Sequence, residues 1–93
     1  MERLKTFEKV RGAILEVLAD TGIDADDIHW ESSLVHDLRL ESLRFVDLTV
    51  SLERAFGLEQ FPMQDWLDDQ LSLAENGFRV EALVDSCLAL TRA

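Results

Sequence analysis

Residues 37–57 of the chain read DLRLESLRFVDLTVSLERAFG, and this stretch decides the fold that we expect. From Ser42 onward its apolar residues recur every three or four positions, which predicts an α-helix over residues 42–56, and Gly57 is a typical C-terminal stop. One apolar stripe is expected to face the core and consists of Phe45, Leu48, Thr49, Leu52 and Phe56. A second stripe, beside charged residues, consists of Leu43, Val46 and Val50.

The second stripe has two interpretations. A surface helix needs only one apolar stripe to dock on its bundle, so an extra stripe indicates a site for a partner. Alternatively the core is wider than usual, and the long loop before the helix packs over the stripe. Periodicity alone leaves both open.

Three further helices are predicted around this one. The first covers about residues 4–19, with Gly22 just past its end, and the short third helix covers about residues 62–72 and opens at Pro62, which a first helical turn tolerates. The fourth helix covers about residues 79–91, and its inner face is expected to comprise Val80, Leu83, Val84, Cys87 and Leu90. Residues 1–93 therefore predict one all-α domain, a four-helix bundle with a long loop between its first two helices.

The long loop, residues 20–41, is rich in acidic residues but does not fit a calcium loop. Counting from Asp24, His29 and Val35 stand where an EF-hand needs Gly and Glu. Its apolar residues are expected to pin the loop onto the bundle, because a long loop without such anchors tends to be disordered. These residues are Ile28, Trp30, Leu34, Leu38 and Leu40.

Charge and cysteine content restrict the function. The net charge of −10, from 19 acidic and 9 basic residues, disfavours nucleic acid and anionic membranes as partners. It suits a partner with a basic patch, although solubility alone would also explain it.

Cys87 is the single cysteine, so we expect no disulfide and no Cys-based zinc site. We also expect His29 and His36 to be solvated rather than metal ligands. With no signal peptide and no membrane span expected, a cytoplasmic location is predicted.

Ser42 stands where the loop ends and the helix begins. A serine there is commonly an N-cap, because its oxygen accepts a free backbone N–H. No His, Cys or second carboxylate is arranged beside Ser42 to activate it as a nucleophile. We therefore do not expect an enzyme.

The segment from Ser33 to Leu43, SLVHDLRLESL, resembles the attachment motif of acyl carrier proteins, which typically reads Asp-Leu-Gly, an apolar residue, then Asp-Ser-Leu. Glu41 replaces the usual Asp, while the matching residues are Asp37, Leu38, Leu40, Ser42 and Leu43. The similarity then covers most of the chain in order, at Val46, Asp47, Leu48, Leu52, Glu53, Phe56, Gly57, Pro62, Val80, Glu81, Ala82, Val84 and Asp85.

This resemblance implies that a phosphopantetheinyl transferase attaches 4′-phosphopantetheine from coenzyme A to Ser42, and that the arm holds an acyl cargo as a thioester. A helix N-terminus suits the resulting phosphodiester. Acyl-loading and acyl-using enzymes are the further partners implied, and the family suggests a monomer. The partner-binding residues that we expect are Glu41, Leu43, Arg44, Val46, Asp47, Val50 and Arg54.

The chain departs from the family pattern in three places. Arg39 replaces the usual Gly, and an Arg would be costly there if the Gly adopts a positive φ. Arg44 and Arg54 stand where the family is usually acidic, so we hypothesise a dedicated partner with an acidic spot rather than the housekeeping fatty-acid synthase. The region around the third helix is longer than usual and carries Trp66. Trp66 and the inward-facing Phe45 either complete the core or reshape the cargo cavity for a short or unusual cargo.

Three functions remain open at this point. The leading one is a free-standing acyl carrier for a lipid, polyketide or other specialised pathway. An aminoacyl or peptidyl carrier usually shows Gly-Gly before the motif, where this chain has Arg39 and Leu40. The third is an acidic docking module that is never modified, which would keep its function after Ser42→Ala.

Overall fold

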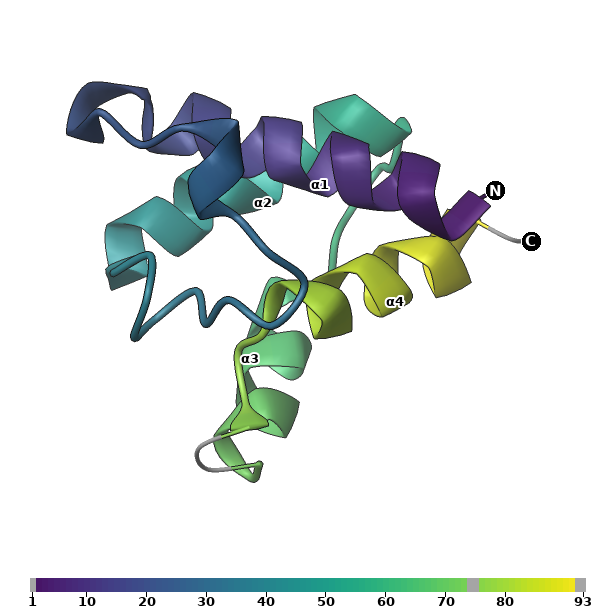
Figure 1. Ribbon diagram of the computed structural model, residues 1–93. Helices are drawn as coiled ribbons and strands as arrows, with labels where there is room; N and C mark the ends of the chain where they lie inside the picture. The colour runs from purple at the N-terminus through teal and green to yellow at the C-terminus, as the bar shows by residue number, and fades with distance from the viewer. Residues whose placement is uncertain (1, 74–75, 92–93) are drawn as a thin grey trace.

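A computed structural model describes residues 2–73 and 76–91 of the chain, and it confirms the all-α prediction (Figure 1). The four α-helices are α1 (Glu2–Val17), α2 (Ser42–Phe56), α3 (Met63–Leu71) and α4 (Val80–Thr91). Two short 3₁₀ turns, η1 (Ala19–Thr21) and η2 (Ala25–Asp27), lie between α1 and α2. The described residues contain no β-strand, only an isolated antiparallel bridge between Ser33 and Arg79.

Helix α1 lies at the centre of the packing, against α2 on one side and α4 on the other, whereas α3 projects away from these three helices (Figure 1). The core between α1, α2 and α4 is closed by residues with no exposed surface, namely Val10, Ile14, Leu48, Leu52, Val80, Leu83, Val84 and Cys87. The prediction for Leu90 is wrong, because its side chain is 39% exposed. Leu90 lies in the last turn of α4, at the edge of the buried stripe formed by Val80, Leu83, Val84 and Cys87.

The helix ends differ slightly from those predicted. Helix α1 stops at Val17 rather than near residue 19, and the chain tightens into η1, as helix C-termini often do. Gly22 and Gly57 adopt left-handed backbones, with φ of 78° and 65°. Gly57 terminates α2 as predicted, whereas Gly22, which was predicted to end the first helix, terminates η1 instead. Pro62 occupies the N-cap position of α3 rather than its first helical position.

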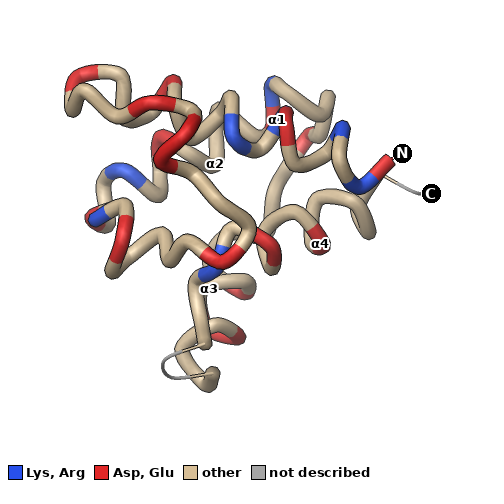
Figure 2. The backbone as a smooth tube through the Cα atoms, in the orientation of Figure 1, with Lys and Arg blue, Asp and Glu red and all other residues tan. Residues whose placement is uncertain are grey.

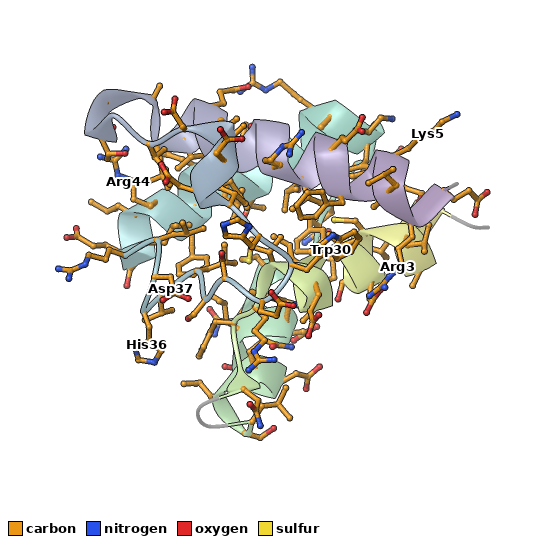
Figure 3. The ribbon with its side chains drawn as sticks, viewed as in Figure 1. Arg3, Lys5, Trp30, His36, Asp37 and Arg44 are labelled. Carbon is orange, nitrogen blue, oxygen red and sulfur yellow. The ribbon has the colours of Figure 1, made fainter. Side chains whose placement is uncertain are left out.

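The long loop between α1 and α2 is pinned to the bundle as predicted. Ile28, Leu34, Leu38 and Leu40 are buried, and Trp30 stacks on Phe7 of α1 with ring centroids 4.4 Å apart. The Arg3 guanidinium lies 4.7 Å from the centroid of the Trp30 ring, so the two labelled side chains lie together (Figure 3).

Backbone and acidic groups of the loop also close helical turns. The C=O groups of Trp30 and Ser32 accept the N–H groups of Glu81 and Val80 at 2.9 Å, which satisfies donors at the start of α4. Asp27 accepts the N–H of Asp24 at 2.9 Å across η2. Within residues 2–73 and 76–91, no three potential ligands cluster as a metal site would require.

Basic and acidic residues are unevenly distributed over the fold. Four of the eight described Lys and Arg residues lie on α1, at positions 3, 5, 9 and 11, whereas Asp and Glu occur on all four helices and in the long loop (Figure 2). None of the helices in the described part combines the length and the apolar character needed to cross a membrane.

Candidate functional site

Ser42 is the first residue of α2, and Glu41 occupies the N-cap position with an extended backbone. The interpretation of Ser42 as the N-cap is therefore wrong, although the predicted start of the helix is correct. The Ser42 side chain is exposed and makes no hydrogen bond to any residue that the structure describes. Its hydroxyl is consequently free to react.

The first turn of α2, which Ser42 begins, has free backbone donors. The first hydrogen bond of the helix runs from the Phe45 N–H to the Glu41 C=O at 3.1 Å. The N–H groups of Ser42, Leu43 and Arg44 thus have no helical acceptor, and no side chain caps them. Such a helix N-terminus favours a negatively charged group attached beside it.

Tertiary contacts of the preceding loop fix the position of Ser42. The Leu40 side chain is buried, and its N–H donates to the Leu34 C=O at 2.8 Å. Between Leu38 and Leu40, Arg39 adopts a left-handed backbone with φ of 57°. Arg39 therefore has the positive φ at which we expected an arginine to be energetically unfavourable.

The second apolar stripe of α2 is exposed to solvent. Leu43, Val46 and Val50 are 78%, 61% and 47% exposed. The interpretation in which the loop packs over this stripe is wrong, because the loop turns its apolar side chains into the core instead. The molecule thus presents an unpartnered apolar face that begins next to Ser42.

An open groove of about 1110 Å³ lies beside this face, between α2, α3 and the end of the long loop. Its apolar lining consists of Val35, Leu40, Phe45, Val46, Val50, Met63, Leu67, Leu71 and Phe78. Its polar lining consists of His36, Glu41, Ser42, Thr49, Gln64 and Asp68. Ser42, the candidate attachment residue, therefore lies on the wall of an apolar groove. This groove can shelter an apolar chain that begins near Ser42.

Phe45 and Trp66, which could either complete the core or shape the cargo cavity, have different roles in the structure. Phe45 is buried and also lines the groove, so it belongs to both the core and the cavity wall. Trp66 is buried, does not line the groove, and packs edge-on against Phe78 with ring centroids 6.3 Å apart. Trp66 therefore completes the core and affects the groove only through Phe78.

Arg44 turns away from the groove toward the end of α1 (Figure 3). Its guanidinium pairs with both carboxylate oxygens of Asp20 at 3.0 and 2.9 Å, and donates to the Val17 C=O at 2.6 Å. The hydrogen bond from Arg44 holds the pKa of Asp20 below its ordinary value. The Val17 contact places a cation at the C-terminus of α1, where the helix dipole favours it.

Arg54 is also paired within the molecule, because its guanidinium lies 2.9 Å from a carboxylate oxygen of Glu16 on α1. Neither Arg54 nor Arg44 lines the groove, whereas Glu41 does. Asp47 is exposed on α2. The charges next to the exposed apolar stripe are thus mainly acidic, and the two arginines are bound to acids of the neighbouring elements.

Sequence reasoning missed the wall of the groove opposite α2. Leu67 and Leu71 are four residues apart on α3, so their helical spacing was a usable signal. Phe78 carries no such signal, since its contribution depends on a left-handed backbone with φ of 63° between α3 and α4.

Comparisons with known proteins agree with this geometry. Residues 8–75 match the family described as "Phosphopantetheine attachment site". The acyl carrier protein of Coprothermobacter proteolyticus is 33% identical over 88 residues, which cover 95% of this chain and 96% of that protein. The chain belongs to the acyl carrier protein family. The predicted family is therefore confirmed, and with it a covalently attached 4′-phosphopantetheine.

Other acyl carrier proteins match shorter stretches of the chain. Acyl carrier protein AcpXL of Brucella melitensis is 35% identical over 65 residues, covering 69% of this chain and 64% of that protein. The acyl carrier protein of Clostridium acetobutylicum is 45% identical over 53 residues, covering 57% of this chain and 65% of that protein. No solved structure matches the chain.

Proposed function

We propose that Ser42 is the attachment residue of this acyl carrier protein, and that the protein delivers an acyl intermediate to enzymes of a lipid, polyketide or other specialised biosynthetic pathway. The observation that carries the proposal is the free Ser42 hydroxyl at the uncapped start of α2, on the lining of an apolar groove. The attached arm supplies a thiol that holds the acyl group as a thioester.

The attachment step needs an external enzyme. The Ser42 oxygen forms a bond to the phosphorus of the phosphopantetheine part of coenzyme A, and adenosine bisphosphate leaves. A base must take the hydroxyl proton, and no described side chain hydrogen-bonds to Ser42 to serve as that base. We therefore assign the base to a phosphopantetheinyl transferase and consider this chain a carrier rather than an enzyme.

The groove favours an uncharged, apolar cargo. Most of its lining is aliphatic or aromatic, and its acidic lining residues are Glu41 and Asp68. Among the described residues, no Lys or Arg lines it. A cargo with its own carboxylate would be repelled by these groups, whereas an alkyl chain would bury apolar surface. An aminoacyl thioester carries an ammonium group, which these carboxylates would attract, so the preference for an acyl over an aminoacyl cargo rests on the apolar lining alone.

The partner surface that we propose combines Leu43, Val46 and Val50 with the nearby carboxylates of Glu41 and Asp47. An enzyme that docks here would offer apolar contacts together with Lys or Arg. Arg44 and Arg54 lie at the edge of this surface, where an acidic spot on a dedicated partner would compete with Asp20 and Glu16 for them. Cytoplasmic location and monomeric state remain predictions.

The test is a modification assay on the purified chain. It is incubated with coenzyme A and a broad-specificity phosphopantetheinyl transferase, and intact mass and peptide mapping follow. We expect one phosphopantetheine on the peptide that contains Ser42, no addition in Ser42→Ala, and normal addition in Ser72→Ala, a control at another exposed serine. If no phosphopantetheine is added, even by a transferase from the source organism, the proposed carrier function is wrong and the unmodified docking module takes its place.

A further inference from the structure

Phe78 is the groove residue contributed by the connection between α3 and α4. Its ring is half-buried on the groove, and its backbone is left-handed with φ of 63°. An aromatic residue rarely adopts this conformation, and such residues occur preferentially where a site depends on their position. Glycine would adopt it without strain, but would leave this part of the groove wall without a side chain.

Hydrogen bonds hold the backbone of Phe78 on both sides. Its N–H donates to the side-chain oxygen of Gln70 at 3.0 Å, and its C=O accepts the Leu34 N–H at 2.7 Å. Gln70 and Leu34 are themselves buried. Because both polar groups are engaged with fixed partners, the direction in which the Phe78 side chain leaves the backbone is also fixed.

Trp66 supports the Phe78 ring from the core. The two rings meet edge-on, with centroids 6.3 Å apart and an interplanar angle of 80°. Trp66 is buried within the core cluster and has little room to move. The Phe78 ring therefore cannot retreat into the core when a chain enters the groove.

We propose that Phe78 determines the largest acyl group that the groove accepts. The proposal rests on the carrier function proposed above. The ring takes up groove volume that a longer or bulkier chain would need, and Trp66 and the two backbone hydrogen bonds keep it in place. Phe78→Ala enlarges the groove and admits longer chains, whereas Phe78→Trp reduces it and admits only shorter ones.

The test compares cargo length between variants. Wild type, Phe78→Ala and Phe78→Trp are loaded by the transferase from straight-chain acyl-coenzyme A donors of increasing length, which places an acyl-phosphopantetheine on each protein. The Tm of each acyl form is then measured against the unacylated holo form. In the wild type we expect the Tm gain to rise with chain length as apolar surface is buried, and then to level off. The levelling point should move to longer chains in Phe78→Ala and to shorter chains in Phe78→Trp.

A matched control separates groove size from general destabilisation. Phe56→Ala truncates another half-buried phenylalanine, which lies outside the groove, so it should lower every Tm and leave the levelling point unchanged. If Phe78→Ala does not fold, Phe78→Leu takes its place beside Phe78→Trp. Loading of all variants with an unchanged levelling point would overturn the role of Phe78, whereas a failure of every variant to accept the arm would overturn the carrier function itself.

Discussion

Replacing Arg39 by Gly should stabilise the protein. Arg39 has φ of 57°, which costs an L-residue about 1–2 kcal/mol relative to its preferred conformations. Glycine removes that cost, but its more flexible unfolded chain gives back about 0.5–1 kcal/mol. The Arg39 side chain is exposed and has no hydrogen bond or ion pair within the described residues, so little else is lost. From the middle of these two ranges, the net gain is about 0.75 kcal/mol in the free energy of unfolding.

Urea denaturation and thermal unfolding of the apo protein measure this gain. For a chain of 93 residues, it corresponds to a rise in Tm of roughly 2–8 °C, with the urea midpoint raised and the m-value unchanged. Arg39→Ala is the matched control, because alanine removes the same side chain but keeps the strained backbone. Equal stability of Arg39→Gly and Arg39→Ala would refute the argument that backbone strain, rather than side-chain loss, controls this position.

Two further predictions concern ionisable groups. Arg44→Ala should lower the Tm by a few degrees at neutral pH, since the pair with Asp20 is largely solvent-exposed. Because Arg44 lowers the pKa of Asp20 below its ordinary 3.8, the part of this difference that comes from the pair should be present above about pH 4 and be lost as acid protonates Asp20, leaving the part that comes from the bond between Arg44 and the Val17 C=O. A difference that does not shrink in acid would contradict the pairing. Burial raises the pKa of the Cys87 thiol to about 12, so a thiol reagent at pH 8 should not label the native apo protein and should label the holo form once, on the arm. Labelling of native apo protein that Cys87→Ser abolishes would show that the core opens.

The sequence was informative wherever local rules decide the structure. The periodicity of residues 42–56 predicted α2 with both of its apolar stripes, and Gly22 and Gly57 marked turn and helix ends through their tolerance of positive φ. Leu34 and its apolar neighbours in the loop were correctly expected to be buried. Each of these inferences depends on residues close together in the chain.

Contacts between residues far apart in the chain could not be predicted from these local patterns. Arg44 and Arg54 were expected to give the recognition face a mixed charge, but their partners Asp20 and Glu16 lie 24 and 38 residues away in the chain. Helical spacing places a side chain on a face, but does not show which neighbouring element it meets. The exposure of the second stripe was undecided for the same reason, because it depends on the path of the loop.

The backbone of Leu34 connects the two strained positions of the described chain. Its N–H donates to the Phe78 C=O at 2.7 Å, and its C=O accepts the Leu40 N–H at 2.8 Å. One hydrogen-bonded path thus runs from Phe78 on the groove, through a buried residue, to Leu40, which directly follows Arg39 and stands two residues before Ser42. The strain at Arg39 and Phe78 is compatible with folding because these buried bonds would be lost if either residue relaxed. The position of Ser42 relative to the groove therefore follows from the tertiary contacts of the loop, and not from α2 alone.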